Sequence, residues 1–300
     1  MELRHLRYFQ KVAELSSFSE AARALNITQS TLSQQTKKLE EELGVTLLQR
    51  DSHHVELTDV GKAILPAVEK ILSDANTCVN IIHDVKDLGV GSLTIGATQS
   101  FTPLLKETVI DFTRQYPGVK LTIVCKQMEK LMSMVDKREI DIALCYRPTM
   151  PMFDSIRTEK LFDSSLCVVV SDTHPLASRK EIDITDLQKL TLSLPEKGTQ
   201  ARNTFDQIIS GLGLRLKVHI EMTEINMLLD VVQGTRFATL VSQITTINRK
   251  GLKAIPLKIN GSKMEGSIHY RRDTYMKKAT KRFLEMLSDH NSYNLALLSL

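Results

Sequence analysis

The stretch of sequence that decides the fold runs from residue 17 to residue 44 and reads SFSEAARALNITQSTLSQQTKKLEEELG. Its apolar residues recur at helical spacing in two blocks, which predicts a short helix over residues 20–25 and a longer one that ends at about Leu43. Ser19 and Thr28 are predicted to cap these helices at their N-termini, and the last glycine of the stretch is expected to end the second helix. Two helices joined by so short a turn indicate a helix-turn-helix.

The longer helix carries different chemistry on its two sides. Leu32, Leu39 and Leu43 form a stripe that is predicted to be buried. The opposite side carries hydroxyl, amide and lysine side chains, which match the hydrogen-bonding edges of bases and the phosphates of DNA. We expect this side to enter the major groove, although the residues alone leave an ordinary solvated helix face open. The candidate DNA-contacting residues are Thr28, Gln29, Ser30, Thr31, Ser33, Gln34, Lys37 and Lys38.

Segments on both sides extend this motif. Apolar residues from Leu3 to Val12 recur at three-residue steps and predict a preceding helix. Downstream, residues 45–50 and 55–57 flank a polar turn and predict a two-stranded wing. Arg50, His53 and His54 lie at that wing and are candidates for contact with the DNA backbone or minor groove.

The ordered run of residues resembles the DNA-binding end of the LysR-type transcriptional regulators. The resemblance is carried by Leu6-Arg7-Tyr8-Phe9, Ser17-Phe18-Ser19-Glu20-Ala21-Ala22, Thr28-Gln29-Ser30-Thr31-Leu32-Ser33, Leu43-Gly44-Val45 and Leu57-Thr58. It implies a winged helix-turn-helix domain over residues 1–58, with the helix-turn-helix at about 18–37. It also implies promoter DNA as a partner, a homodimer or a dimer-of-dimers homotetramer, and leaves RNA polymerase open as a further partner.

Two departures from the family pattern concern DNA contact. Gln34 stands where the family commonly carries an arginine, and His53-His54 occupy a wing that is usually richer in arginine. The preferred bases and the affinity of the wing for phosphate are therefore expected to differ from those of typical members.

Residues 59–89 lack strand signals and predict one long linker helix. Its apolar residues alternate at steps of four and three, as in the seam of a coiled coil. This pattern fits either pairing with a second copy or packing on a neighbouring element of the same chain. The family resemblance favours dimerisation. The predicted dimerisation residues are Ile64, Val68, Ile71, Ala75, Cys78, Ile82 and Val85.

From residue 91 onward apolar strands alternate with amphipathic helices, which predicts an α/β domain with a parallel sheet. Strands are expected at 92–97, 119–125, 140–146, 166–171, 190–194, 216–221, 238–241, 254–259 and 266–270, and helices at 103–115, 129–136, 201–210, 225–232 and 275–289. The four cysteines show no metal-ligand spacing, so neither a metal site nor a disulfide framework is expected. We expect them to be reduced and mostly buried, and we expect no cofactor.

Within the LysR family this region resembles the two-lobed effector-binding domain with a periplasmic-binding-protein-like (type 2) fold. Tyr116-Pro117-Gly118-Val119, Glu139-Ile140-Asp141-Ile142-Ala143 and His174-Pro175-Leu176 carry the resemblance. It implies an effector domain over residues 90–300, with lobe I at about 90–162 and 266–300 and lobe II at about 163–265. The segments 98–147 and 221–242 are most similar to the cyanate-responsive members.

A ligand is expected where strands of an open α/β sheet end and helices begin, because free amides and a partial positive charge gather there. Residues 98–102 and 198–200 make two such junctions, with Thr102 predicted as a helix cap. Their hydroxyls and amides favour a small anionic effector. The candidate effector-binding residues are Thr98, Gln99, Ser100, Phe101, Thr102, Gln127, Tyr146, Arg147, Thr199 and Gln200.

Two other functions compete with that of an effector-controlled regulator. An enzyme is disfavoured because the chain has no GxSxG, HExxH, P-loop or GxGxxG motif, and Ser100 lacks the flanking glycines of a nucleophile elbow. Redox sensing, which some members of the family perform, stays open as an alternative. It is disfavoured because Cys125, Cys145 and Cys167 fall within apolar strand runs that predict burial.

Length, composition and charge limit the possible domain number, location and partners. A chain of 300 residues with 42% hydrophobic and 25% charged residues predicts two or three compact domains. No apolar run is long enough to cross a bilayer, so we expect a cytoplasmic protein without a membrane partner. The net charge of +4 favours nucleic acid. However, residues 1–58 hold seven Lys and Arg against eight Asp and Glu, whereas residues 89–300 hold 29 against 22. The excess of basic residues therefore lies outside the DNA-binding end.

Overall fold

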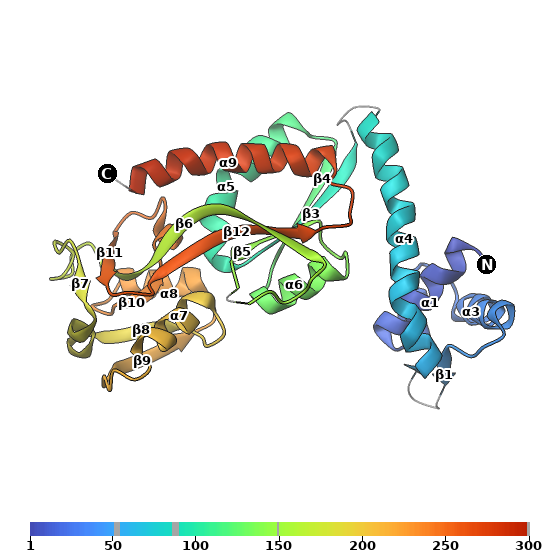
Figure 1. Cartoon of the computed structure of the whole chain (residues 1–300), viewed down its shortest axis with the longest axis horizontal. Coiled ribbons are helices and arrows are strands. Elements are labelled where there is room, and N and C mark those ends of the chain that lie inside the picture. Colours follow the sequence, from blue (N-terminus) through green and yellow to red (C-terminus); the bar gives the residue numbers. More distant parts are fainter. Residues whose placement is uncertain (51–54, 86–89, 149, 299–300) are drawn as a thin grey trace. The chain divides into compact units, whose positions relative to one another are not determined.

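The computed structural model describes residues 1–50, 55–85, 90–148 and 150–298. The chain forms two compact units, Met1–Ile82 and His83–Leu300. Figure 1 labels their helices and strands. Most of the predicted linker helix thus folds together with the predicted DNA-binding domain. His53 and His54, two of the predicted wing contacts, lie outside the described residues.

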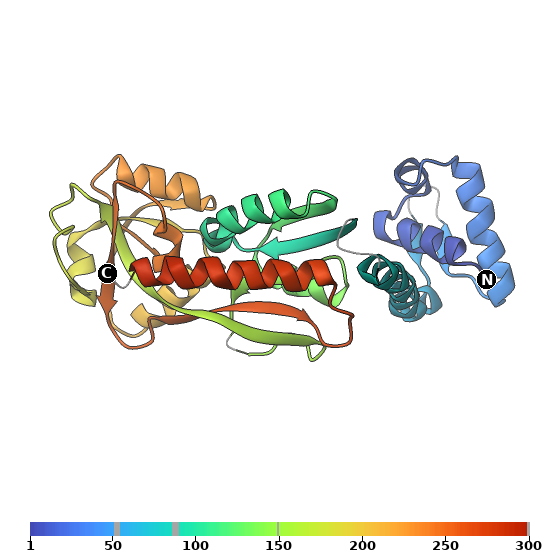
Figure 2. The same ribbon diagram turned by 90° about the horizontal axis from the view of Figure 1, so that it is seen from above.

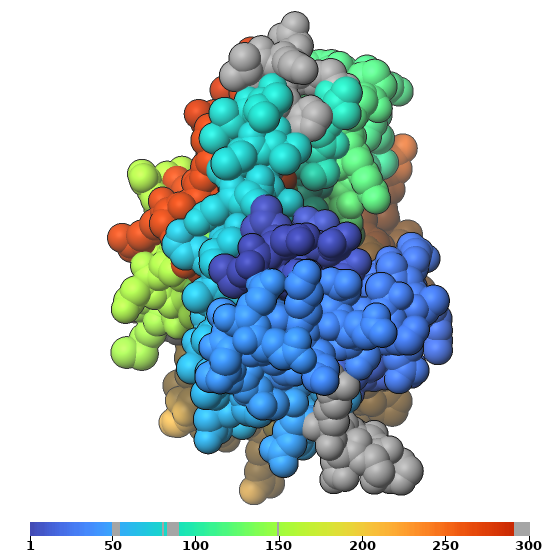
Figure 3. All heavy atoms as spheres, turned by 90° about the vertical axis from the view of Figure 1, so that its right-hand side faces the viewer, coloured from blue at the N-terminus to red at the C-terminus, as the bar shows by residue number. Residues whose placement is uncertain are grey.

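The first unit is a winged helix-turn-helix, drawn in blue to cyan in Figure 3. Its helices are α1 (Leu3–Leu15), α2 (Phe18–Ala24) and α3 (Gln29–Leu43). Apolar side chains of all three are buried together, among them Phe9, Ala21 and Leu32. Leu43 was predicted to be buried but is 40% accessible, because it lies at the end of its helix.

The predicted caps are correct for α3 and wrong for α2. The Thr28 side chain accepts a hydrogen bond from the Thr31 amide at 3.2 Å, and Gly44 ends the helix with a positive φ of 68°. At α2 the cap is Ser17, whose hydroxyl accepts from the Glu20 amide. Ser19 lies inside the helix instead. The helix starts earlier than predicted because Phe18 joins the buried core.

The predicted wing is present as the antiparallel pair β1 (Leu48–Arg50) and β2 (Val55–Leu57). One Glu40 carboxylate oxygen accepts from the amides of Leu47 and Leu48, at 2.7 and 3.0 Å. This carboxylate ties α3 to the start of the wing. Helix α4 (Asp59–Val85) follows, and its Val68 and Leu72 complete the core of the first unit.

The second unit is built on a mixed sheet with strand order β4-β3-β5-β12-β6-β11-β7, in which β10 also pairs with β6. Its strands are β3 (Gly91–Ala97), β4 (Val119–Cys125), β5 (Ile142–Tyr146), β6 (Ile156–Ser171), β7 (Ile182–Asp183), β10 (Thr239–Ser242), β11 (Leu252–Lys258) and β12 (Lys263–Arg271). Strands β8 (Thr191–Pro195) and β9 (Lys217–Met222) form a separate parallel pair.

The prediction of a parallel sheet holds only in part. Strand β3 is parallel to β4 and β5, but β5 and β6 both pair with β12 in antiparallel orientation. The cause is the 16-residue strand β6, of which the sequence pattern predicts only the last third. Its first half pairs with β12 and its second half with β10 and β11, so it passes from one lobe to the other.

Helices cover the sheet in both lobes (Figure 2). They are α5 (Thr102–Gln115), α6 (Met128–Asp136), α7 (Gln200–Ile209), α8 (Ile225–Gln233) and α9 (Lys278–Leu298), with 3-10 turns η1 (Gln99–Phe101), η2 (Ile184–Lys189) and η3 (Gln243–Thr246). Helix α9 packs against α5 through the rings of Phe112 and Phe283, whose centroids are 5.3 Å apart. No helix in the described ranges combines the length and apolar character that crossing a membrane requires.

Candidate functional site

The predicted DNA-reading side of α3 is on the surface of the first unit. Thr28, Gln29, Ser30, Thr31, Gln34, Lys37 and Lys38 are exposed, and Ser33 is half-buried. Several of these polar groups are held in place by their neighbours. Ser19 donates to Gln29 at 3.1 Å, and Thr28 lies within 3.0 Å of the hydroxyls of both Ser30 and Thr31. The N-terminal end of α3 is therefore ordered before any contact with DNA.

Other predicted DNA contacts are less constrained. Lys37 forms only a loose ion pair with Glu41, at 3.6 Å. The amide of Gln34 is exposed beside it. Arg50 ends β1, and its side chain, like His53 and His54, lies outside the described residues. The face of α3 thus offers an amide and two lysines for base edges and phosphates.

The predicted dimerisation residues divide into two groups along α4. Val68 is buried and Ile64 is half-buried against the core of the first unit, so Val68 offers no surface to a second copy. Ile71 and Ile82 are 40% and 56% exposed, and Val79 and Ile81 are exposed beside them. Ala75 is half-buried and Cys78 exposed. The side chain of Val85 is outside the described residues.

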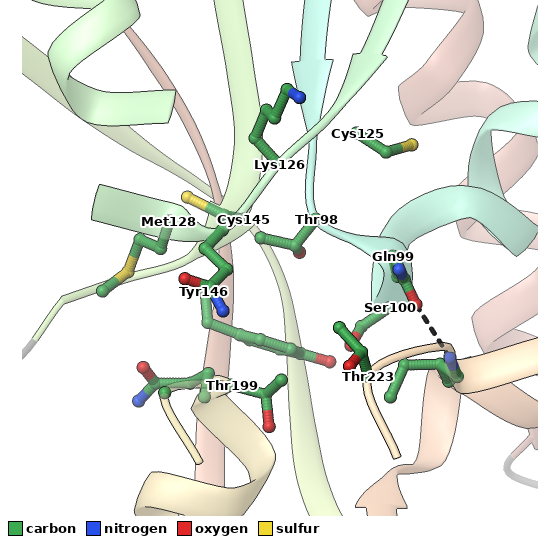
Figure 4. Close-up of a pocket in the computed structure, with 14 residues that line it drawn as sticks. Thr98, Gln99, Ser100, Cys125, Lys126, Met128, Cys145, Tyr146, Thr199 and Thr223 are labelled. Carbon is green, nitrogen blue, oxygen red and sulfur yellow. Dashed lines mark hydrogen bonds between the residues drawn. The ribbon is translucent and has the colours of Figure 1, made fainter. Parts of the chain in front are cut away.

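A cavity of about 270 Å³ opens between the two lobes of the second unit. Figure 4 shows Thr98, Ser100, Tyr146, Thr199 and Thr223 around it. Seven of the ten predicted effector-binding residues line it, namely Thr98, Gln99, Ser100, Gln127, Tyr146, Thr199 and Gln200. The strand-to-helix junctions of both lobes do therefore meet at one place.

Apart from Lys126, the residues that line this cavity are uncharged. None of its lining residues is Asp or Glu, and Lys126 contributes a cation at the rim. Helices α6 and α7 begin there, one from each lobe, and their first amides lack intrahelical acceptors. The side chain of Gln127, which precedes α6, makes no capping bond, and Thr199 caps only the Arg202 amide. Such a cavity suits a small anion.

A hydrogen bond made by Gln99 joins the two lobes at the cavity. The Gln99 side-chain oxygen accepts from the amide of Ile225 at 2.8 Å, shown as a dashed line in Figure 4. The other amides at the start of α8 are satisfied by the carboxylate of Glu224. The hydroxyl of Thr98 is buried and has no partner among the described residues. It is therefore available to a ligand.

Tyr146 forms the floor of the cavity. Its hydroxyl donates to Ser242, which also lies 2.7 Å from Ser164. Burial raises the pKa of Tyr146 well above its ordinary value, so the phenol stays protonated at neutral pH. The ring packs edge-on against Phe101, with centroids 5.1 Å apart.

Three predicted effector-binding residues do not line the cavity. Phe101 is fully buried behind Tyr146, so it supports the wall from outside the cavity. Thr102 is the first residue of α5, whose N-cap is Phe101, and its hydroxyl donates to the Gln99 carbonyl at 2.8 Å. Arg147 points elsewhere and pairs with Glu265 at 3.0 Å. The alternation of side chains along an extended strand separates it from Tyr146.

The cavity also contains residues that the sequence analysis missed. These are Cys125, Lys126, Met128, Cys145, Gly198, Thr223 and Ile225. Lys126 follows β4 and Thr223 follows β9, each just before a helix. Both stand at the same kind of strand-to-helix junction that identified Thr98 and Thr199. Applying that rule to every junction would have found them.

The cysteines differ in accessibility. Cys145 and Cys167 are buried as predicted, and burial raises the pKa of the Cys167 thiol to about 11. Cys78 and Cys125 are exposed, so the predicted burial is wrong for Cys125. Cys125 ends β4, an edge strand, and partial desolvation together with Glu224 raises its pKa. No cluster of three or more His, Cys, Asp or Glu residues that would hold a metal ion occurs in the described part of the chain.

A winged helix-turn-helix joined to a two-lobed α/β unit with a cavity between the lobes defines a ligand-responsive DNA-binding protein. Two family models match this chain. Residues 3–62 match the bacterial regulatory helix-turn-helix protein, lysR family, and residues 86–292 match the LysR substrate binding domain. The chain therefore belongs to the LysR family of transcriptional regulators.

Similar proteins agree with this assignment. The HTH-type transcriptional regulator AlsR of Bacillus subtilis is 35% identical over 242 residues, which cover 78% of each chain. The RuBisCO operon transcriptional regulator of Allochromatium vinosum is 24% identical over 96% of this chain and 95% of its own. A full-length OxyR variant from Pseudomonas aeruginosa shares the fold with a TM-score of 0.71 at 23% identity, covering 97% and 94% of the two chains. The narrower resemblance to cyanate-responsive members stays a prediction.

Proposed function

We propose that this protein regulates transcription by binding promoter DNA through α3 and by changing that binding when a small anion occupies the interlobe cavity. The observation that carries the proposal is the cavity itself: strand-to-helix junctions from both lobes meet there, with a lysine and no lining carboxylate. The effector domain of about residues 90–300 would act as the sensor and the domain of about residues 1–58 as the DNA reader.

The effector would be held by both lobes at once. Thr98 offers an unpartnered hydroxyl from lobe I, and the first amides of α7 approach from lobe II. Gln127, which precedes α6, lies near Gly198, because a Cβ on that glycine would be 3.9 Å from the Gln127 amide nitrogen. A ligand that contacts both sides stabilises whichever lobe arrangement brings them together, and it shifts the population of states accordingly.

Self-association through α4 is part of the proposal. Ile71 and Ile82 present exposed apolar surface on that helix, and Ala75 and Cys78 lie between them. Residues 1–58 hold seven basic against eight acidic residues, so the affinity of one copy for DNA would be modest and pairing would increase it. The test is sedimentation of Ile82→Lys, which should shift the chain toward monomer. The exposed control Val90→Lys should not.

The cavity proposal is tested by thermal shift with small anions on the full chain. Ligands that raise the melting temperature of the wild type should fail to do so in Thr98→Val, which removes the unpartnered hydroxyl but keeps the side-chain shape. Lys106→Gln, an exposed lysine on α5 outside the cavity, is the matched control and should respond like the wild type. An equal shift in Thr98→Val and the control would contradict this placement of the effector.

Redox sensing is the second candidate. The exposure of Cys125 at the cavity favours it, but the raised pKa of this thiol disfavours the reactive thiolate. Peroxide treatment followed by footprinting separates the two functions. An unchanged footprint in the presence of peroxide supports the anion-responsive regulator.

A further inference from the structure

A second cavity, of about 550 Å³, lies on the surface of the second unit where the chain leaves β5 and enters β6. Arg147 follows β5 and Arg157 lies near the start of β6. Tyr270 lies near the end of β12, and Arg272 directly follows that strand. This cavity shares no lining residue with the interlobe cavity. Tyr146 lines the first and Arg147 the second, as the alternation of an extended chain requires.

Three guanidinium groups line the second cavity, and none of its lining residues is Asp or Glu. Two of the arginines have carboxylate partners beyond the lining. Arg147 pairs with Glu265 and Arg157 with Glu159, each at 3.0 Å. Arg272 donates through Nε to the Ile156 carbonyl at 3.2 Å, and within the described ranges it has no carboxylate partner. The two existing ion pairs therefore do not neutralise all the positive charge of the lining.

The existing ion pairs leave donors free for a ligand. A guanidinium has five N–H groups, and each of these arginines uses one nitrogen in the bonds above. The side chains of Arg147 and Arg157 are 57% and 61% exposed. Ion pairs at such exposure contribute little to stability, because water screens both charges. An anion that offers two oxygens to a guanidinium fork competes successfully with them.

The remaining lining suits a carbon skeleton. Pro148 and Pro151 come from the segment after β5, and the buried Ile156 and the ring of Tyr270 belong to β6 and β12. The Tyr270 hydroxyl donates to Glu159 at 2.5 Å, and its pKa is raised to about 12, so it stays a donor at neutral pH. Apolar walls with a few placed polar groups are typical of sites for small organic ligands.

We propose that this second cavity binds a small organic anion that carries two or more carboxylate or phosphate groups. Three guanidinium groups around one cavity exceed what a single carboxylate satisfies, which favours a multiply charged ligand. The site is separate from the interlobe cavity and does not depend on the proposed function. Arg147, which does not line the interlobe cavity, would bind the anion in this second cavity.

The test is titration calorimetry of the full chain with citrate and, separately, with inorganic phosphate. We expect the double variant Arg157→Gln/Arg272→Gln to raise the Kd for citrate at least tenfold, because two charged donors are lost. Lys106→Gln, an exposed lysine on α5 that lines neither cavity, should leave this Kd unchanged. Binding of citrate alone assigns the site to polycarboxylates, and binding of phosphate as well extends it to phosphorylated ligands.

The single variant Arg157→Gln controls for a folding defect in the double variant, because among the described residues the Arg157 side chain bonds only the exposed Glu159. It should raise the Kd for citrate severalfold with an unchanged urea midpoint. An equal Kd for citrate in the wild type and both variants overturns the proposal. So does a loss of citrate binding in Lys126→Gln alone, since that result places the anion in the interlobe cavity.

Discussion

At the scale of single residues, Gln99 joins the two lobes through one side chain. Its side-chain amide oxygen accepts from the Ile225 amide, an orphan donor at the start of α8. One such bond contributes about 0.5–1.5 kcal/mol. That is enough to bias the arrangement of the lobes without locking it. Gln200 lines the same cavity and provides a matched comparison.

We predict that Gln99→Leu accelerates hydrogen exchange at the Ile225 amide about threefold to tenfold, because the amide loses its acceptor. Gln200→Leu should leave that exchange rate unchanged. The measurement is amide exchange of the full chain by NMR or mass spectrometry. Equal protection of Ile225 in both variants would show that Gln99 does not link the lobes in solution.

His269 makes stability depend on pH. It is fully buried on β12 beside Thr158, and desolvation lowers its pKa from 6.5 to about 4. Between these values the unfolded chain binds a proton that the folded chain does not. Above pH 6.5 the free energy of unfolding should therefore keep its full value. As the pH drops it should decrease, and at pH 4 it should be lower by about 3 kcal/mol.

His269→Gln should remove that part of the pH dependence, since glutamine does not titrate. Urea unfolding at pH values from about 7.5 down to about 4 measures it. The exposed His219→Gln serves as the control and should keep the wild-type slope. A wild-type slope in His269→Gln would mean that other groups cause the acid sensitivity.

At the scale of elements, α4 is packed closely on the wing of the first unit. A Cβ at Gly61 would stand 2.2 Å from the Leu47 carbonyl oxygen, which also accepts from the Thr58 amide at 3.0 Å. Alanine usually stabilises a helix by about 1 kcal/mol relative to glycine. Here the clash is with backbone that cannot rotate away, so strain should exceed this gain.

Gly61→Ala is thus expected to destabilise the first unit by about 1–3 kcal/mol. The loss of helical circular dichroism in urea measures it. Gly91→Ala, where nothing lies within 4 Å of the added carbon, should change stability little. A stabilised Gly61→Ala variant would contradict the close packing of α4 on the wing.

Helix α3 should read bases and phosphates with different residues. Gln34→Ala is expected to reduce discrimination against a changed base by about 1–3 kcal/mol. Lys38→Gln should weaken binding to all sequences alike and lower the salt dependence by about one phosphate contact. Lys120→Gln, an exposed lysine of the second unit, is the control. Anisotropy titrations with operator and mutated DNA at several salt concentrations separate the three outcomes.

Elements with local signals were predictable from sequence, and those set by distant pairing were not. Thr28 and Gly44 bracket α3 correctly because caps act within one turn. The first part of β6 escapes prediction because its burial alternates irregularly and its partner, β12, is far away in the sequence. Five cavity residues are identified by the two strand-to-helix junctions at 98–102 and 198–200. Arg147 was misassigned to the cavity, although the alternation of side chains along an extended chain separates it from Tyr146.

At the scale of the whole molecule, charge and function are distributed unevenly. Residues 1–58 carry no net basic excess, so DNA binding depends on a few placed groups and on pairing of copies. The basic excess of residues 89–300 is partly explained by Lys126 and by the three arginines of the second cavity. Overall charge favoured a DNA-binding protein, but it did not locate the residues that bind DNA.

We propose that occupancy of the interlobe cavity changes sequence-specific DNA binding. Quantitative footprinting of the full chain on its promoter DNA, with and without the anion that raises its melting temperature most, tests it directly. We predict that the anion changes operator affinity or footprint boundaries, with a coupling of about 1–3 kcal/mol, in the wild type and not in Thr98→Val. Equal affinity for operator and unrelated DNA, or a wild-type footprint that does not respond to the anion, would contradict the account.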